Sequence, residues 1–145
     1  MNGIDFEKLN NDWAALAHKA RRTEEISYAE LLEAFRATHI AFKSLAGEDK
    51  ICREAFRAVM LMDEFIYYAT IADRNYMGSI CSSLYYLNHA LKEEFFKGDY
   101  RSEFFLGPDP KEKEVYFLDI ENIDVESFGR FLEGKLGGDF NDLEL

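Results

Sequence analysis

The sequence predicts a mainly α protein: an antiparallel four-helix bundle with a C-terminal β-hairpin and a short helix appended. Two observations lead to this prediction. Apolar residues recur at three- and four-residue steps through most of residues 1–98, which is the period of a helix buried along one side. Residues 99–138 then change in character, because Pro108, Pro110 and several glycines interrupt any helical period.

Local signals delimit the first two predicted helices. The first should run from about Asp5 to Arg22, and its apolar stripe consists of Phe6, Leu9, Trp13, Leu16 and Ala20. The second should begin at Ser27, because a serine followed three residues later by Glu30 is a capping-box signature. Gly47 should end it. The apolar stripe of this helix consists of Tyr28, Leu31, Leu32, Phe35, His39, Phe42 and Leu45.

The third predicted helix, residues 49–73, is apolar on two sides. One side consists of Ile51, Ala55, Ala58, Val59, Met62, Phe65, Ile66, Ala69 and Ala72, and the other of Cys52, Phe56, Met60, Tyr67, Tyr68 and Ile71. Such a helix is either the centre of a bundle or half of an interface. After a break at Arg74-Asn75, a fourth helix should span residues 76–97, with Met77, Ile80, Cys81, Leu84, Leu87, Asn88, Leu91 and Phe95 as its stripe.

The remaining residues should cover one flank of this bundle. Residues 104–106 and 115–118 could pair as a hairpin around the two prolines, and Asp124 can cap a last helix that extends to about Leu136. Short connections favour sequential antiparallel packing of the helices. We therefore expect a single domain, residues 1–145, with a bundle core at 1–98, the hairpin and short helix at 99–138, and an acidic tail at 139–145.

The charge of the chain limits the classes of partner that it can bind. The formal net charge is −11, and residues 99–145 hold 13 of the 28 acidic but only 5 of the 17 basic side chains. An acidic surface of this kind repels nucleic acid and anionic membranes and favours basic protein partners. Two cysteines, Cys52 and Cys81, do not make a disulfide framework. With no signal peptide and no stretch long enough for a membrane span, a cytoplasmic location is expected.

Several polar and aromatic side chains are candidates for a binding site. His39 lies on an apolar stripe, and either Asp63 or Glu64 could be buried, since adjacent residues point about 100° apart on a helix. His89, Glu93 and Tyr85 share one side of the fourth helix. The tyrosines occur as doublets on neighbouring helices. The candidate pocket consists of Glu64, Tyr67, Tyr68, Tyr85, His89 and His39.

Metals and cofactors are not expected. The Glu-x-x-His pattern of di-iron bundles fails at all three histidines. The segment from Asp119 to Asp124 lacks the glycine of a calcium loop. No catalytic or phosphate-binding motif is present, so the sequence favours a function other than catalysis, and an enzyme stays open as the alternative.

Two classes of function remain open. The first is a protein-interaction or regulatory module that works through a homo-oligomer or partner interface. One form of such a module is an acidic inhibitor or immunity-type protein with a basic partner. The alternative is a small-molecule-binding protein or enzyme with a Tyr/Glu/His pocket between the second, third and fourth helices.

Overall fold

The computed structural model describes residues 5–22, 24–45, 52–72, 81–97, 103–106 and 116–133. It is mainly helical, as the sequence predicts. The elements in chain order are α1 (Phe6–Arg21), α2 (Tyr28–Lys43), α3 (Arg53–Ala72), α4 (Cys81–Lys97), β1 (Glu103–Leu106), β2 (Tyr116–Asp119) and α5 (Val125–Leu132). No helix within these ranges is long and apolar enough to cross a bilayer.

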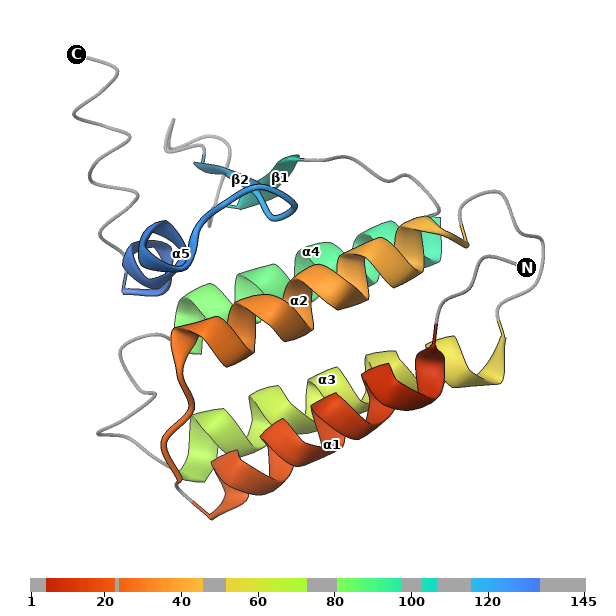
Figure 1. Cartoon of the computed structure of the whole chain (residues 1–145), viewed down its shortest axis with the longest axis horizontal. Coiled ribbons are helices and arrows are strands. Elements are labelled where there is room, and N and C mark those ends of the chain that lie inside the picture. Colours follow the sequence, from red (N-terminus) through yellow and green to blue (C-terminus); the bar gives the residue numbers. More distant parts are fainter. Residues whose placement is uncertain are drawn as a thin grey trace.

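The four long helices lie in two layers, with α1 and α3 in one layer and α2 and α4 in the other (Figure 1). The most extensive contact joins α1 to α3, and α4 contacts both α2 and α3. Helices α2 and α3 follow one another in the chain but lie diagonally across the layers (Figure 1). We expected each helix to pack on the next one in the chain. This expectation is wrong for α2 and α3, because the main contacts of α3 are with α1 and α4.

Side-chain caps begin three of the helices where the sequence predicts. The Asp5 carboxylate accepts a hydrogen bond from the backbone N–H of Lys8, and Asp124 accepts one from Ser127. Ser27 and Glu30 form the complete capping box at α2. These bonds span three residues, so sequence alone can locate them. The predicted stop at Gly47, the break at 74–75, the proline turn and the tail at 139–145 lie outside the described residues.

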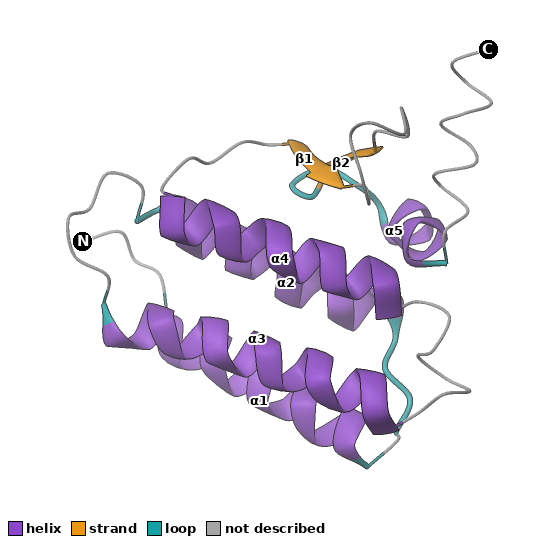
Figure 2. Ribbon diagram, turned by 180° about the vertical axis from the view of Figure 1, so that it is seen from behind, coloured by secondary structure: helices purple, strands orange, loops and turns teal. Residues whose placement is uncertain are grey.

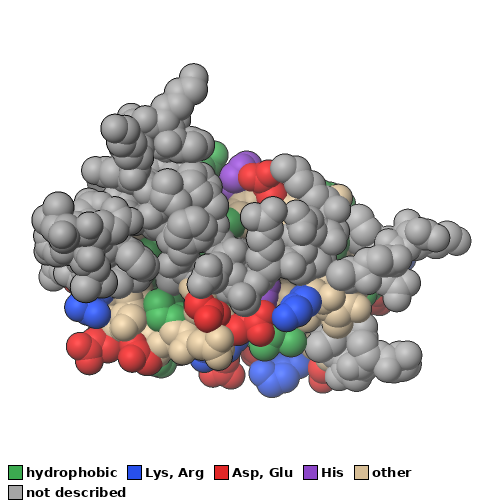
Figure 3. Space-filling model, turned by 90° about the horizontal axis from the view of Figure 1, so that it is seen from above, with side chains coloured by type: hydrophobic (Ala, Val, Ile, Leu, Met, Phe, Trp, Pro, Cys, Tyr) green, Lys and Arg blue, Asp and Glu red, His purple; other side chains and the backbone are tan. Residues whose placement is uncertain are grey.

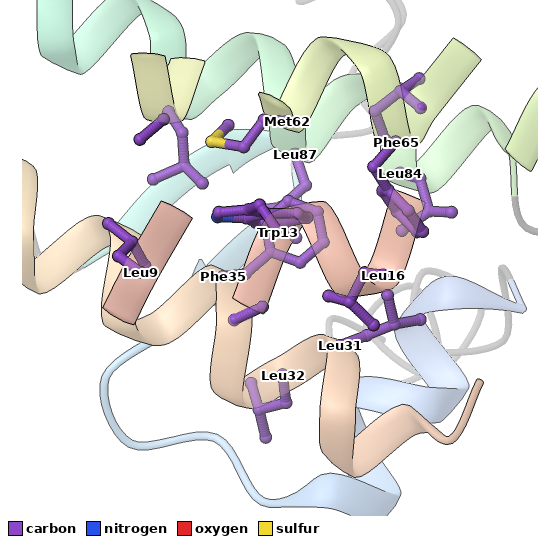
Figure 4. Packing of buried hydrophobic residues seen from close by; sticks show 14 of the residues in the cluster. Leu9, Trp13, Leu16, Leu31, Leu32, Phe35, Met62, Phe65, Leu84 and Leu87 are labelled. Carbon is purple, nitrogen blue, oxygen red and sulfur yellow. The ribbon is translucent and has the colours of Figure 1, made fainter. Parts of the chain in front are cut away.

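Trp13 is at the centre of the core. Its side chain is fully buried, and its ring lies 5.0 Å from that of Phe35 on α2 and 5.6 Å from that of Phe65 on α3. Leucines of α1, α2 and α4 and Met62 of α3 surround it (Figure 4). Each of the four helices thus contributes to one continuous core. This core determines which side of each helix faces inward and which side faces outward.

The C-terminal elements lie against the layer of α2 and α4 (Figure 2). Strands β1 and β2 pair antiparallel, with Glu103 opposite Asp119 and Leu106 opposite Tyr116. Helix α5 contacts α2 and α4, and its Phe128 and Leu132 are fully buried. The described part of this flank therefore adds to the core on the α2–α4 side.

Gly129 allows α5 to approach α2 closely. A Cβ atom at this position would lie 2.5 Å from Cδ2 and 2.8 Å from Cε2 of the Tyr28 ring. Helix propensity alone predicts that Gly129→Ala stabilises a helix by about 0.5–1 kcal/mol. We expect the opposite here, a loss of about 1–3 kcal/mol, because the ring must move. Urea unfolding followed by circular dichroism would measure the change.

The control for this prediction is the same substitution in a Tyr28→Ala background. Without the ring, Gly129→Ala should be neutral or stabilising. If Gly129→Ala stabilises the protein that retains Tyr28, the close packing of α5 on α2 is contradicted.

Candidate functional site

Large hydrophobic side chains are exposed together on the outer side of α3 and α4. Of the seven such side chains in the described residues, two are elsewhere, at Ile40 and Val125. The other five are between 45% and 59% exposed and are Phe56, Met60, Tyr67, Tyr85 and Phe96. Both helices are in front in Figure 2, so this side faces the viewer there.

The same arrangement of side chains occurs on both helices. The residues at spacings of four, three and four are Phe56, Met60, Asp63 and Tyr67 on α3, and Tyr85, His89, Lys92 and Phe96 on α4. Such spacing confines each set to about 60° of the helix circumference. We call these eight residues the α3–α4 face. Each set has an aromatic residue at both ends and a charged residue in third place, negative on α3 and positive on α4.

Contacts across the α3–α4 face show that the two helices run antiparallel. The rings of Phe56 and Phe96 lie 6.3 Å apart in an edge-to-face arrangement. Asp63 Oδ1 accepts hydrogen bonds from Asn88 Nδ2 at 2.8 Å and from Lys92 Nζ at 3.1 Å. The centre of the face therefore holds one acidic and one basic side chain that already pair, between apolar and aromatic ends.

The structure distributes the six predicted pocket residues over three places. Tyr67, Tyr85 and His89 belong to the α3–α4 face, where the rings of Tyr85 and His89 stack 6.4 Å apart. Glu64 and Tyr68 instead line a cleft against α1, and His39 is fully buried on the α2 side of the core. Neither Asp63 nor Glu64 is buried.

His39 bridges two carboxylates inside the protein. Its Nδ1 lies 3.1 Å from Glu94 Oε2 of α4, and its Nε2 lies 2.8 Å from Glu121 Oε2 in the turn after β2. Burial lowers the pKa of His39, but the hydrogen bonds to the two carboxylates outweigh burial and raise the pKa above 6.5. The hydrogen bonds from His39 and Lys43 lower the pKa of Glu121. The imidazolium and the carboxylates therefore stabilise one another.

Cationic side chains of α2 hold this turn in place. Arg36 donates from Nε to the carbonyl oxygen of Ile120 at 2.9 Å and from Nη2 to that of Ile123. Lys43 Nζ lies 3.2 Å from Glu121 Oε2. With His39 between them, the three side chains follow one side of α2. They attach the turn after β2 to this helix.

Two clefts that described residues line are smaller than a typical ligand pocket. A cleft between α1 and α2 has a volume of about 190 Å³, and the cleft that Glu64 lines has about 120 Å³. Ligand pockets typically have roughly 300–1,000 Å³. Among the described residues, no group of three or more His, Cys, Asp or Glu side chains could hold a metal ion. In the buried cluster, the two carboxylates lie at different nitrogens of the His39 ring.

Comparisons with protein-family models, with curated proteins and with solved structures find no match to this chain. The candidate site therefore rests on the side chains of the chain itself.

Sequence reasoning missed part of the α3–α4 face. It placed Phe56, Met60 and Tyr67 on the second side of the third helix, but it assigned no role to Lys92 or Phe96. The signal that could have found them is the repeat of one spacing on two helices, with aromatic ends and opposite charges at the same place. Arg36 gave no such signal, because its partners lie 84 and 87 residues further along the chain.

Proposed function

We propose that this protein is a protein-interaction module that works through the α3–α4 face. One observation supports the proposal most directly: five of the seven exposed large hydrophobic side chains in the described residues gather on this face. Aromatic residues and methionine are enriched in protein interfaces, and a contiguous exposed apolar patch is typical of an interaction site. Single exposed apolar residues, such as Ile40, need no such explanation.

The proposed architecture is an antiparallel four-helix bundle with the β-hairpin and short helix as an appended flank. The contacts of α4 with both layers and the pairing of β1 with β2 support it. In this architecture the flank covers the α2–α4 side. The large hydrophobic side chains of the α3–α4 face are then accessible, at 45–59% exposed.

The charges around the face favour an apolar contact over capture of a strongly basic partner. Asp63 and Lys92 compensate each other at its centre. His89 Nε2 likewise lies 3.1 Å from Glu93 Oε2. Figure 3 shows the molecule from above, a view in which acidic and basic side chains of described residues also lie near one another; it is not a view of the α3–α4 face. An acidic inhibitor of immunity type would need an acidic contact surface, so this version of the interaction hypothesis has less support.

Site-specific photocrosslinking tests the proposal. A photoreactive benzoylphenylalanine in place of Met60 should form a covalent adduct with a protein partner upon irradiation of cells that produce the chain. The reason is that Met60 lies in the middle of the α3–α4 face and is 59% exposed. Mass measurement and peptide sequencing of the adduct would identify the partner, whether it is another protein or a second copy of this chain.

Ile40 provides the matched control. It is also a large hydrophobic residue, 44% exposed, but it lies on α2 outside the face. The same photoreactive residue at position 40 should give no adduct. The proposed function is contradicted if position 60 gives no adduct, or if positions 40 and 60 give adducts equally.

A further inference from the structure

We infer that the α3–α4 face binds a second copy of this chain, with α3 of one subunit over α4 of the other. This inference rests on the proposed interaction function and adds the identity and orientation of the partner. A two-fold dimer places the same patch on both subunits, so the patch must be complementary to itself. The first requirement is therefore charge complementarity within one face.

The α3–α4 face meets this requirement because its two helices carry opposite charges at equivalent places. Asp63 is third in the set on α3, and Lys92 is third in the set on α4. Within one subunit these side chains lie 3.1 Å apart across the helix pair. A second copy offers the same pair, so each carboxylate can find an additional cation and each ammonium an additional anion. The acidic excess of the whole chain is absent from this face.

The charges also select the orientation of the two copies. A two-fold axis parallel to the helices places α3 over the partner's α4, and Asp63 then lies near Lys92 of the partner subunit. A two-fold axis perpendicular to the helices and in the plane of the interface places α3 over the partner's α3. Asp63 would then face Asp63 of the partner subunit. Opposed like charges at an interface are unfavourable, so the first orientation is preferred.

The aromatic ends of the two sets favour association in either orientation. Both helices begin and end their set with an aromatic ring, so rings meet rings at either end of the interface. Aromatic pairs in edge-to-face or offset geometry are favourable beyond the area that they bury. The Phe56–Phe96 contact already has edge-to-face geometry within one subunit. The apolar contacts supply affinity, and the two charge pairs specify which helix faces which.

Sedimentation velocity of the purified full chain over a wide concentration range tests the dimer. We expect twice the chain mass of 16.9 kDa. Met60→Lys should weaken the dimer by about a hundredfold or more, because it replaces an apolar contact of the interface by a charged group that must lose its water on association. Ile40→Lys, which places the same charge on an exposed position of α2, should leave the dimer unchanged. Circular dichroism would verify that both variants remain folded.

Charge reversal tests the orientation. Asp63→Lys should weaken the dimer by about tenfold, since it opposes like charges at two places. The double variant Asp63→Lys/Lys92→Asp should restore the dimer. If α3 instead lies over α3 of the partner, the single reversal leaves the number of like-charge pairs unchanged, and the dimer is not weakened. That result would overturn the orientation.

The two proposals fail in different ways. A strictly monomeric wild-type chain overturns the second copy as partner. If position 60 still crosslinks to a different protein in cells, the interaction function remains supported and only its partner is wrong. If the chain is monomeric and position 60 forms no adduct, both proposals fail.

Discussion

Replacing Trp13 by alanine is expected to lower the free energy of unfolding by about 3–5 kcal/mol. The Trp13 side chain is fully buried and packs against rings on α2 and α3. Its removal would leave a cavity where three helices meet. Small domains have about 5–15 kcal/mol of stability in total, so this one substitution should remove a large share. Urea unfolding monitored by far-UV circular dichroism would measure it, since the variant lacks the only tryptophan.

Part of this effect should come from one buried hydrogen bond. Trp13 Nε1 donates to Thr38 Oγ1 at 2.7 Å, and the Thr38 hydroxyl in turn donates to the carbonyl oxygen of Ala34. Thr38→Val should cost about 1–3 kcal/mol, because it leaves the indole N–H buried without an acceptor. In the Trp13→Phe background the same change should cost less, because the donor is gone. A loss below about 1 kcal/mol for Trp13→Ala would contradict the central position of this residue.

Replacing His39 by glutamine is expected to lower the free energy of unfolding by about 3 kcal/mol near pH 6. His39 is fully buried between Glu94 and Glu121, and its raised pKa keeps the ring protonated there. Glutamine carries no charge, so it would leave Glu94 without the cation that faces it on α2. Removing one partner of a buried charged cluster is more costly than the net contribution of the cluster.

The same cluster predicts how stability depends on pH. A raised pKa in the folded state stabilises the protein fully below the unfolded value of 6.5, and this contribution is lost as the pH rises through the folded value. The lowered pKa of Glu121 acts in the opposite direction, because its contribution is present above 4.5 and is lost as the pH falls through the folded value. The cluster should therefore stabilise the protein most between pH 4.5 and 6.5.

The free energy of unfolding should be measured as a function of pH in His39→Gln and in His89→Gln. The comparison separates the pH dependence due to His39 from that of the rest of the chain. The decline in stability above pH 6.5 that the wild type owes to this histidine should disappear in His39→Gln. His89→Gln should change stability by no more than about 0.5 kcal/mol, since His89 is exposed and its partner Glu93 lies at the surface. Identical pH profiles for the two variants would contradict the role of His39.

Local features of the sequence were sufficient for the helices and for the starts of three of them. They were wrong for the end of α5, which lies at Leu132 and not near Leu136. Ser27 and Glu30 predicted the start of α2, and Asp124 predicted the cap of α5, because a cap joins residues only three apart. Helical periodicity also separated two sides of α3. The candidate pocket shows the limit of such reasoning. Glu64, His39 and His89 are plausible partners by residue type, but nothing in the spacing of the sequence says which helices they would share.

The sequence by itself determined that the chain is mainly helical, where three of its helices begin, and that α3 has two apolar sides. Only the tertiary structure decided that Met62 and Phe65 face the core while Phe56, Met60 and Tyr67 face outward. Both sides of α3 are apolar enough to be buried, so the choice depends on which side α1 and α4 contact. Packing of distant segments thus makes the second side of this helix a surface, and the proposed function depends on that surface.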